Sequence, residues 1–253
     1  MSTRPLTRIL LVGGAGRVGA RLQALASTID GMSIVGMLAR DQASAAKLHA
    51  TEAARQDRSI SHEIKAFSRG EADVIIDFSS PDGSMRALEL ARHVDAALLV
   101  GTTGLSAATI AALREESTTR AVMHAPNTSL GVAALAEAVR RIASRLAKFD
   151  VSIVESHHSA KRDAPSGTAI RLARAARDGG ATLRDDQILA IRGGDVVGEH
   201  TVRFAGAGEY VELTHRATSR DVFVVGALKA AAWLASQKPG WWSIEHSFAI
   251  EAQ

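Results

Sequence analysis

The chain contains no cysteine, and it is also poor in aromatic residues and proline. Aromatics make up 4% of its 253 residues, and five residues are proline. The absence of cysteine excludes a disulfide-stapled fold, a thiol nucleophile and a cysteine-ligated metal centre. Because 46% of the residues are nevertheless hydrophobic, the core must be built mainly from alanine, valine, leucine and isoleucine. A chain of this length forms one large domain or two small ones.

No apolar run is long enough to span a membrane, and no apolar segment follows the first eight residues as it would in a signal peptide. We therefore expect a cytoplasmic protein without a membrane partner. Charges of both signs are spread along the chain, with 30 Lys+Arg against 27 Asp+Glu. This balance favours a solvated surface with local charged sites, and it argues against nucleic acid as a partner.

The first half of the chain alternates short apolar runs with helix-length segments. Strands are predicted at residues 7–13, 33–38, 74–78, 97–100 and 121–124. Helices are predicted at residues 42–54, 84–93 and 107–116, whereas residues 56–70 are polar and poorly periodic. This alternation is typical of an α/β fold with a Rossmann-like, doubly wound parallel sheet. Ligands of such sheets bind beyond the carboxyl ends of the strands, where small polar turns follow each predicted strand here.

A glycine-rich turn, Gly13-Gly14-Ala15-Gly16-Arg17-Val18-Gly19, joins the first predicted strand to an amphipathic segment. Glycine lets the backbone turn tightly and approach a pyrophosphate, whose charge the helix N-terminus stabilises. Tight packing alone also produces such turns, but the position between strand and helix favours a dinucleotide. The expected cofactor-binding residues of this turn are Gly13, Gly16, Arg17 and Val18.

The second predicted strand ends where a dinucleotide fold contacts the adenosine ribose. Folds that prefer NAD usually carry an acidic residue there, whereas this chain has Ala39 followed by Arg40. Arg40 favours the additional phosphate of NADP, although Asp41 follows directly and an ordinary loop arginine is the alternative. We therefore predict NADPH, NADH or both as the cofactor.

Residues 155–169 form the most unusual stretch, Glu-Ser-His-His-Ser-Ala-Lys-Arg-Asp-Ala-Pro-Ser-Gly-Thr-Ala. It follows a β-prone run at 151–154 and precedes a helix expected from Thr168 to about Arg177, so both histidines are expected in a loop. The N–H groups of a helix start, the ammonium of Lys161 and two imidazoles together suit an anion and a proton transfer. A solvated turn is the ordinary interpretation of the histidine pair alone. Adjacent residues of an extended segment point to opposite sides, which argues against a shared metal ion.

The second half of the chain has a different pattern. An amphipathic helix is predicted at 131–147, strands at 188–192, 199–205 and 210–217, and a final helix at 222–235. A run of strands after an alternating half predicts a second, smaller α+β domain with a mixed sheet.

The stretch at 155–169 resembles the signature of the 4-hydroxy-tetrahydrodipicolinate reductase family, also called dihydrodipicolinate reductases. Asp-Phe-x-x-Pro at 77–81, Gly-Thr-Thr-Gly at 101–104 and Arg-Gly-Gly-Asp at 192–195 also resemble that family. The likeness extends from Gly13 to about Trp242. Three features depart from the family pattern: Thr128 replaces a usual phenylalanine, Ala133 replaces a frequent asparagine, and the segment before the Arg-Gly-Gly-Asp strand is shorter than in many members.

The resemblance implies reduction of 4-hydroxy-tetrahydrodipicolinate, a small cyclic dicarboxylate, to tetrahydrodipicolinate by NAD(P)H in diaminopimelate and lysine biosynthesis. It assigns proton delivery to His157 and Lys161. The substrate-binding residues that it implies are His158, Ser166, Gly167 and Thr168. The residues that it implies near the nicotinamide are Gly101, Thr102, Thr103, Ala125, Pro126, Asn127 and Thr128.

The same resemblance implies a dinucleotide-binding domain of residues 1–127 and 219–253, a substrate-binding and oligomerisation domain of residues 128–218, and a homotetramer. Two alternatives remain open from the sequence. One is a different NAD(P)-dependent dehydrogenase on the same fold, and the other is a non-catalytic NADP-binding sensor, which Thr128 and the shortened segment suggest. Inhibition by a planar dicarboxylate distinguishes the first alternative, and turnover distinguishes the second.

Overall fold

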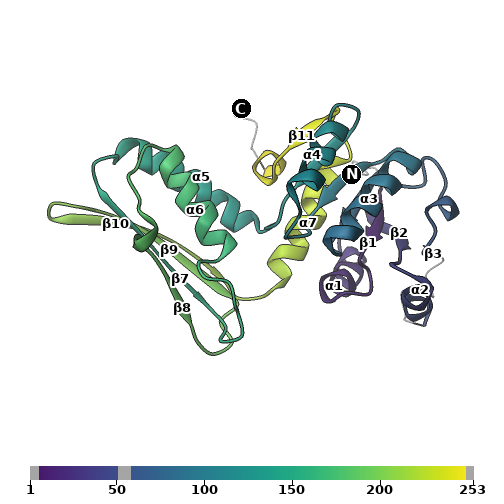
Figure 1. The fold of residues 1–253 in the computed structure, drawn as a ribbon, viewed down its shortest axis with the longest axis horizontal. Helices are drawn as coiled ribbons and strands as arrows, with labels where there is room; N and C mark the ends of the chain where they lie inside the picture. The colour runs from purple at the N-terminus through teal and green to yellow at the C-terminus, as the bar shows by residue number, and fades with distance from the viewer. Residues whose placement is uncertain (1–5, 51–57, 249–253) are drawn as a thin grey trace. The chain divides into compact units, whose positions relative to one another are not determined.

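The computed structural model describes residues 6–50 and 58–248, and the chain divides into two compact units. The first unit comprises residues 1–128 and 223–253, and the second unit comprises residues 129–222 (Figure 1). The predicted pairing of an α/β unit with a smaller α+β unit is confirmed. Within the described residues, no helix is both long and apolar enough to cross a membrane.

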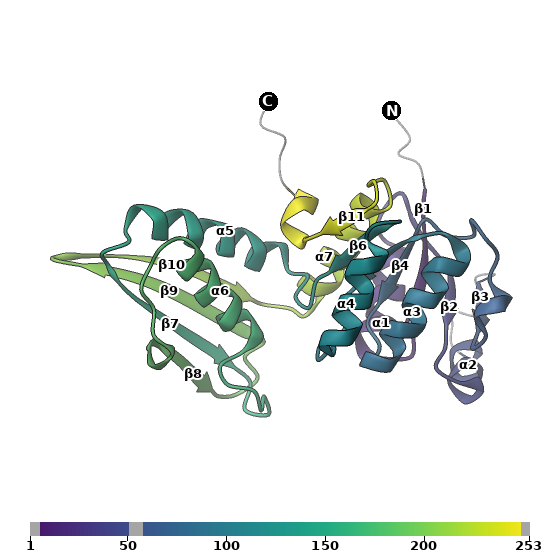
Figure 2. The same cartoon turned by 45° about the horizontal axis from the view of Figure 1, so that its top comes forward.

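The first unit is built on a parallel sheet with the strand order β11-β6-β5-β4-β1-β2-β3 in the described part of the chain (Figure 2). Its strands are β1 (Thr7–Val12), β2 (Met32–Leu38), β3 (Ser59–Ser61), β4 (Val74–Asp77), β5 (Ala97–Val100), β6 (Ala121–His124) and β11 (Gly240–Trp242). Its helices are α1 (Arg17–Ala26), α2 (Gln42–His49), α3 (Pro81–Val94), α4 (Ala107–Glu116) and α7 (Asp221–Leu234). The chain leaves β1 toward β2 and later returns to β4 on the other side of β1. The carboxyl ends of β1 and β4 therefore border a topological switch point, the usual place of a ligand.

Alternate residues of neighbouring strands form the core beneath α3 and α4. Leu10, Ile75, Leu98 and Val122 pack in one buried cluster with apolar residues of these helices, among them Leu88. Helix α7 is mostly apolar, and seven of its residues between Val224 and Leu234 are buried, whereas Lys229 is exposed.

Several elements of the first unit differ from the sequence predictions. The polar segment 56–70 contributes the short edge strand β3, and β11 continues the sheet beside β6 although no strand was predicted there. Helix α3 begins at Pro81, before the predicted start at Ser84, because the Ser80 hydroxyl caps the N–H of Gly83 and proline suits the first helical position. Helix α2 ends at His49, and the rest of its predicted range runs to residues 51–54, outside the described residues.

The second unit has a four-stranded mixed sheet of order β10-β9-β7-β8 in its described residues. The strands are β7 (Asp150–His157), β8 (Ile188–Arg192), β9 (Gly198–Gly206) and β10 (Glu209–Ala217), and β7 with β8 is the parallel pair. Helices α5 (Leu130–Arg145) and α6 (Gly167–Asp178) cover one face of this sheet (Figure 1). Buried and partly exposed residues alternate along β7, so its odd-numbered residues from Val151 to His157 face the helices.

The opposite face of this sheet is open within the second unit. Leu189 and Ile191 of β8 are 54% and 53% exposed, and Tyr210 of β10 is 62% exposed. Leu189 and Ile191 lie opposite Val154 and Ser156 of β7, the residues that point away from the helices. The open face is polar toward β10, where Arg203 pairs with Glu212 and Arg216 pairs with Glu199, so its exposed apolar residues are concentrated on β8.

Candidate active site

Strand β7 extends to His157, three residues beyond the predicted end at Val154, and this corrects the prediction that both histidines lie in a loop. Because strand residues alternate between faces, His157 points to the helix-covered face, where Glu155 also lies. His158 follows the last strand residue and is partly exposed. The two imidazoles therefore occupy different environments.

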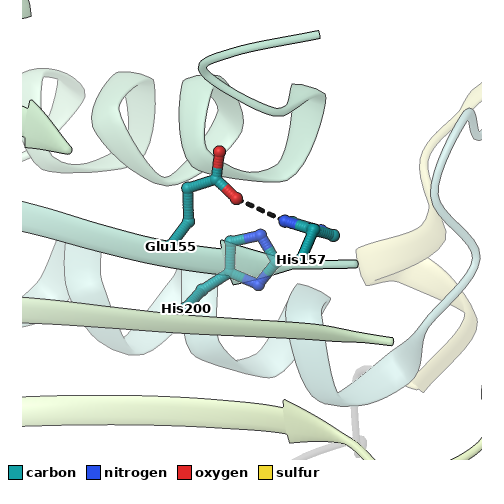
Figure 3. Close-up of side chains that lie close together, drawn as sticks. All are labelled: Glu155, His157 and His200. Atoms are coloured by element: carbon teal, nitrogen blue, oxygen red, sulfur yellow. Dashed lines mark hydrogen bonds and ion pairs between the residues drawn. The ribbon is translucent and has the colours of Figure 1, made fainter. Parts of the chain in front are cut away.

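Glu155 is fully buried and forms hydrogen bonds with three different groups, of which Figure 3 shows His157. Its Oε2 is hydrogen-bonded to Nδ1 of His157, while its Oε1 accepts from Nη2 of Arg192 at 2.8 Å and from the backbone N–H of Ser166 at 3.2 Å. Burial opposes ionisation of this carboxyl group, but the hydrogen bonds from Arg192 and His157 hold its pKa below the usual range. The site thus contains a buried carboxylate that joins a guanidinium to an imidazole.

The surroundings of His157 act on its proton in opposite directions. Burial lowers the pKa of the imidazole, the Glu155 carboxylate raises it, and Lys161 and Arg192 lower it further. The net direction is downward, so the ring is more readily neutral than a histidine in water. Binding of a dianionic substrate would favour the imidazolium again, because an opposite charge nearby stabilises the protonated form.

His200 of β9 completes this cluster and was not predicted from the sequence. Its ring meets that of His157 edge-on with the centroids 5.0 Å apart, and its Nε2 lies 3.2 Å from the Ser166 hydroxyl (Figure 3). Burial, with the neighbouring His157 as a smaller cause, lowers the pKa of His200 to about 4. His200 is therefore a neutral partner of His157 at physiological pH.

The described residues, 6–50 and 58–248, contain one group of potential metal ligands. Its members are Glu155, His157 and His200, whose ligating atoms lie within 4.8 Å of one another. The Glu155 carboxylate already accepts hydrogen bonds from Arg192, Ser166 and His157. A guanidinium beside the carboxylate competes with a cation for the same negative charge. This arrangement suits proton transfer better than metal binding.

The predicted anion-binding residues lie between the end of β7 and the start of α6. Lys161 pairs with Asp163 at 2.8 Å, so its ammonium is partly neutralised. Ser166 is buried, and its hydroxyl caps the N–H of Ala169 at the start of α6. Gly167 is exposed at the first position of the helix, with open space where a side chain would begin, and Thr168 follows it. The backbone of this first turn, more than the Ser166 hydroxyl, is accessible to an anion.

A cavity of about 500 Å³ lies beside His158 within the second unit. Its lining includes His158, Gly194, Asp195 and Arg220. Arg220 was not assigned to the site from the sequence, because only the tertiary structure brings it to the same cavity as His158. An imidazole and a guanidinium on one cavity wall are suited to a carboxylate.

The glycine turn of the first unit has the geometry of a close backbone approach. Gly13 has φ +88°, and a Cβ at Gly19 would lie within 3.0 Å of the Gly13 and Gly14 backbones. Helix α1 begins after Gly16 without a side-chain cap, whereas Asp41, Ser80 and Ser106 cap α2, α3 and α4. Arg17 and Val18 are exposed at this start, where no side chain caps the first backbone N–H groups.

Two arginines, one in the loop after β2 and one on α3, contribute to this loop in different ways. The Arg40 side chain is 84% exposed and pairs with Asp41 at 2.8 Å. Hydrogen bonds from the backbone N–H of Ser44 and from Arg40 lower the pKa of Asp41 far below its usual range. Arg86 of α3 was not predicted to contribute to this loop. It donates hydrogen bonds to the carbonyl oxygens of Ala39 and Arg40 and so stabilises the loop.

The turns after β4 and β5 are connected by a buried carboxylate that was also not predicted. Asp77 accepts hydrogen bonds from Ser79, from Ser84 at 2.6 Å and from Thr102 at 2.8 Å. Burial raises the pKa of Asp77, although these donors oppose the shift. Thr102 is buried and occupied by this network, whereas Thr103 is exposed in the same turn.

The remaining predicted nicotinamide residues differ in accessibility. Ala125 is buried, Pro126 is exposed and Asn127 is partly exposed. The Thr128 hydroxyl is buried and donates to the carbonyl oxygen of Phe223, so this side chain is engaged within its own unit. Gly101 packs against the Phe78 ring so closely that a Cβ there would overlap the ring.

Both halves of the chain match models of one known protein family. Residues 7–128 match the family model described as dihydrodipicolinate reductase, N-terminus, and residues 131–248 match its C-terminus counterpart. The 4-hydroxy-tetrahydrodipicolinate reductase of Myxococcus xanthus strain DK1622 is 38% identical, over 93% of this chain and 95% of the relative. That of Xanthomonas axonopodis pv. citri strain 306 is 41% identical, over 94% of this chain and 96% of the relative.

Solved structures agree on the fold. A dipicolinate-bound dihydrodipicolinate reductase from Paenisporosarcina sp. TG-14 superposes with a TM-score of 0.75 at 18% identity, covering 94% of this chain and 97% of that one. The C. glutamicum DAP dehydrogenase in complex with DAP has a TM-score of 0.56 at 11% identity, covering 96% of this chain and 94% of that one.

The parallel sheet with its glycine turn and the buried acid–base cluster of the second unit are those of an NAD(P)H-dependent oxidoreductase. The chain belongs to the dihydrodipicolinate reductase family. Its activity is the reduction of 4-hydroxy-tetrahydrodipicolinate in diaminopimelate and lysine biosynthesis. The alternatives of a different dehydrogenase and of a non-catalytic sensor are therefore set aside.

Proposed function

We propose that His157 is the proton donor of this reaction and that Lys161 holds a substrate carboxylate beside it. The reaction adds one hydride from NAD(P)H and one proton to the substrate, and it releases the substrate hydroxyl as water. The observation that carries the proposal is the buried imidazole, whose Nδ1 is held by Glu155 so that Nε2 remains the atom that exchanges a proton.

The two carboxylates of the substrate require two anion-binding groups, each made of cationic side chains or free backbone N–H donors. Lys161 and the first turn of α6, at Ser166, Gly167 and Thr168, supply one of them, and the cavity that His158 and Arg220 line supplies the other. Dipicolinate, bound to the Paenisporosarcina relative, is a planar dicarboxylate of related shape. This supports a cyclic dicarboxylate at the same groups in the present chain.

The test of this function is a coupled assay of NADPH and NADH oxidation with freshly generated 4-hydroxy-tetrahydrodipicolinate. We expect rapid oxidation that pyridine-2,6-dicarboxylate suppresses competitively against the substrate. Oxidation without competition by the dicarboxylate would contradict the proposed anion groups. Cofactor binding without oxidation would contradict the proposed proton donor.

For the cofactor, we propose that the first unit binds NAD(P)H, with the pyrophosphate at the start of α1 and the nicotinamide at the turns after β5 and β6. The uncapped N-terminus of α1 supports the first assignment, since its N–H groups lack a side-chain acceptor. Exposed Thr103 and Pro126 support the second. Thr102 and Thr128 would act there through their backbone, because both hydroxyls are engaged inside the unit.

Arg40 is the proposed contact for the 2′-phosphate of NADPH. We expect Arg40→Ala to raise the KM for NADPH about tenfold and to leave that for NADH nearly unchanged, since an exposed charge-assisted contact is lost only with NADPH. Steady-state kinetics with both cofactors measure this. Arg69→Ala is a matched control, because Arg69 is also exposed and paired with an aspartate, Asp95. Equal loss with both cofactors would contradict the role of Arg40.

We also propose a homotetramer in which the open face of the β7–β10 sheet is covered by other copies. The exposed Leu189 and Ile191 of β8 support this, because they are apolar side chains on a face that no helix of the unit covers among its described residues. Light scattering is expected to give the mass of four 26.6 kDa chains, and the double variant Leu189→Lys, Ile191→Lys should give smaller species. Ile170→Lys on α6, equally exposed, is the control and should leave the mass unchanged.

A further inference from the structure

The Glu155 carboxylate is held in place by hydrogen-bond donors other than His157. Its Oε1 accepts from Arg192 at 2.8 Å and from the Ser166 N–H at 3.2 Å, and these donors come from β8 and from the start of α6. The same nitrogen of Arg192 also donates to the carbonyl oxygen of Asp163. Because two separate elements fix Oε1, the carboxyl group cannot rotate freely and Oε2 is directed at Nδ1 of His157 (Figure 3).

The contact between Glu155 and Nδ1 decides which nitrogen of His157 is available to exchange a proton with the substrate. A carboxylate beside Nδ1 retains a proton on that nitrogen, so the exchangeable proton is carried by Nε2. Glycine at position 198 leaves space at this atom, since a Cβ there would lie 3.1 Å from Nε2. The imidazole of His157 also packs edge-on against the ring of His200. His200 is neutral, and its Nε2 is hydrogen-bonded to the Ser166 hydroxyl.

The charges that face His157 come from several elements. Glu155 lies on β7, Arg192 at the end of β8, and Lys161, with its partner Asp163, in the segment before α6. His200 lies on β9, and His215 of β10 acts on His200 in turn. In the described part of the chain, burial, Lys161 and Arg192 all disfavour the imidazolium, whereas Glu155 favours it.

We propose that Glu155, anchored by Arg192, is a positioning residue that fixes the orientation of His157 and stabilises its imidazolium form during turnover. The proposal rests on the proposed role of His157 as proton donor. Glu155 itself is buried behind the imidazole and acts through it. Arg192 keeps Glu155 ionised by providing its countercharge.

The experiment is the pH dependence of kcat for Glu155→Gln. Glutamine has nearly the same shape but lacks the charge, so we expect kcat to fall roughly 10- to 100-fold with an unchanged KM for NADPH. A donor must be protonated, and loss of the carboxylate lowers the pKa of His157, so the alkaline limb of the profile should move about one unit lower. Glu155→Asp, which keeps the charge, should return the limb toward the wild-type position. Glu137→Gln, at an exposed ion pair with Arg141, is the matched control.

A lower kcat with the alkaline limb at its wild-type position would overturn the proposal, because a purely structural role predicts that result. If Glu155→Gln alone fails to fold, the double variant Glu155→Gln, Arg192→Gln removes both buried charges and is compared with Arg192→Gln, since Arg192 itself lowers the pKa of His157. An alkaline limb lower than that of Arg192→Gln supports the proposal, and a limb at the same position overturns it. If His157→Gln is inactive while Glu155→Gln matches the wild type, this proposal alone fails. If His157→Gln retains wild-type turnover, the proposed function of His157 fails first.

Discussion

Replacing His157 with glutamine is expected to lower kcat by roughly a hundred- to ten-thousandfold, the usual contribution of a positioned proton donor. Glutamine can still form a hydrogen bond with Glu155, but it cannot carry the proton that the ring of the substrate must receive. The KM for NADPH should stay nearly unchanged, because the substitution leaves the glycine turn and Arg40 intact. Stopped-flow and steady-state assays at saturating substrate measure the loss.

The control for this variant is His49→Gln at the end of α2, on the surface of the first unit, which should retain wild-type turnover. Circular dichroism establishes that both variants are folded. Wild-type turnover in His157→Gln would show that another group delivers the proton. Lys161 would then be the next candidate, since it is the other partly buried donor beside the end of β7.

Replacing Lys161 with alanine is expected to lower kcat/KM roughly 100-fold, because a charge-assisted contact to a carboxylate is lost and Asp163 remains without its partner. The affinity for pyridine-2,6-dicarboxylate should fall by a similar factor. Since this inhibitor only binds, its dissociation constant separates loss of the carboxylate contact from loss of proton transfer. Isothermal titration calorimetry in the presence of NADPH measures it.

Lys148→Ala is the matched control, because Lys148 is an exposed lysine of the same unit and should change neither quantity. Lys161→Arg should recover dicarboxylate binding in part and turnover less, since a planar guanidinium does not occupy the position of an ammonium. Unchanged dicarboxylate affinity in Lys161→Ala would mean that the helix start and the cavity beside His158 suffice for the anion.

The sequence by itself determined the elements whose signals are local. The apolar runs ending at Val12, Val100 and His124 are strands because short, fully buried β-prone segments need no distant partner to be recognised. Gly13 to Gly19 form a tight turn because a side chain at several of these positions would meet the backbone. The different environments of His157 and His158 did not follow from the sequence, which predicted both in a loop, but from the extension of β7 to His157.

The tertiary structure decided which side chains share a site. Arg192 reaches Glu155 across 37 residues and His200 reaches Ser166 across 34, because β8 and β9 pair with β7 on either side. The register of these pairings depends on the packing of a whole sheet on α5 and α6, which no local pattern records. For the same reason β3 and β11 escaped prediction, since short polar or aromatic segments become strands only when an existing sheet edge offers them hydrogen bonds.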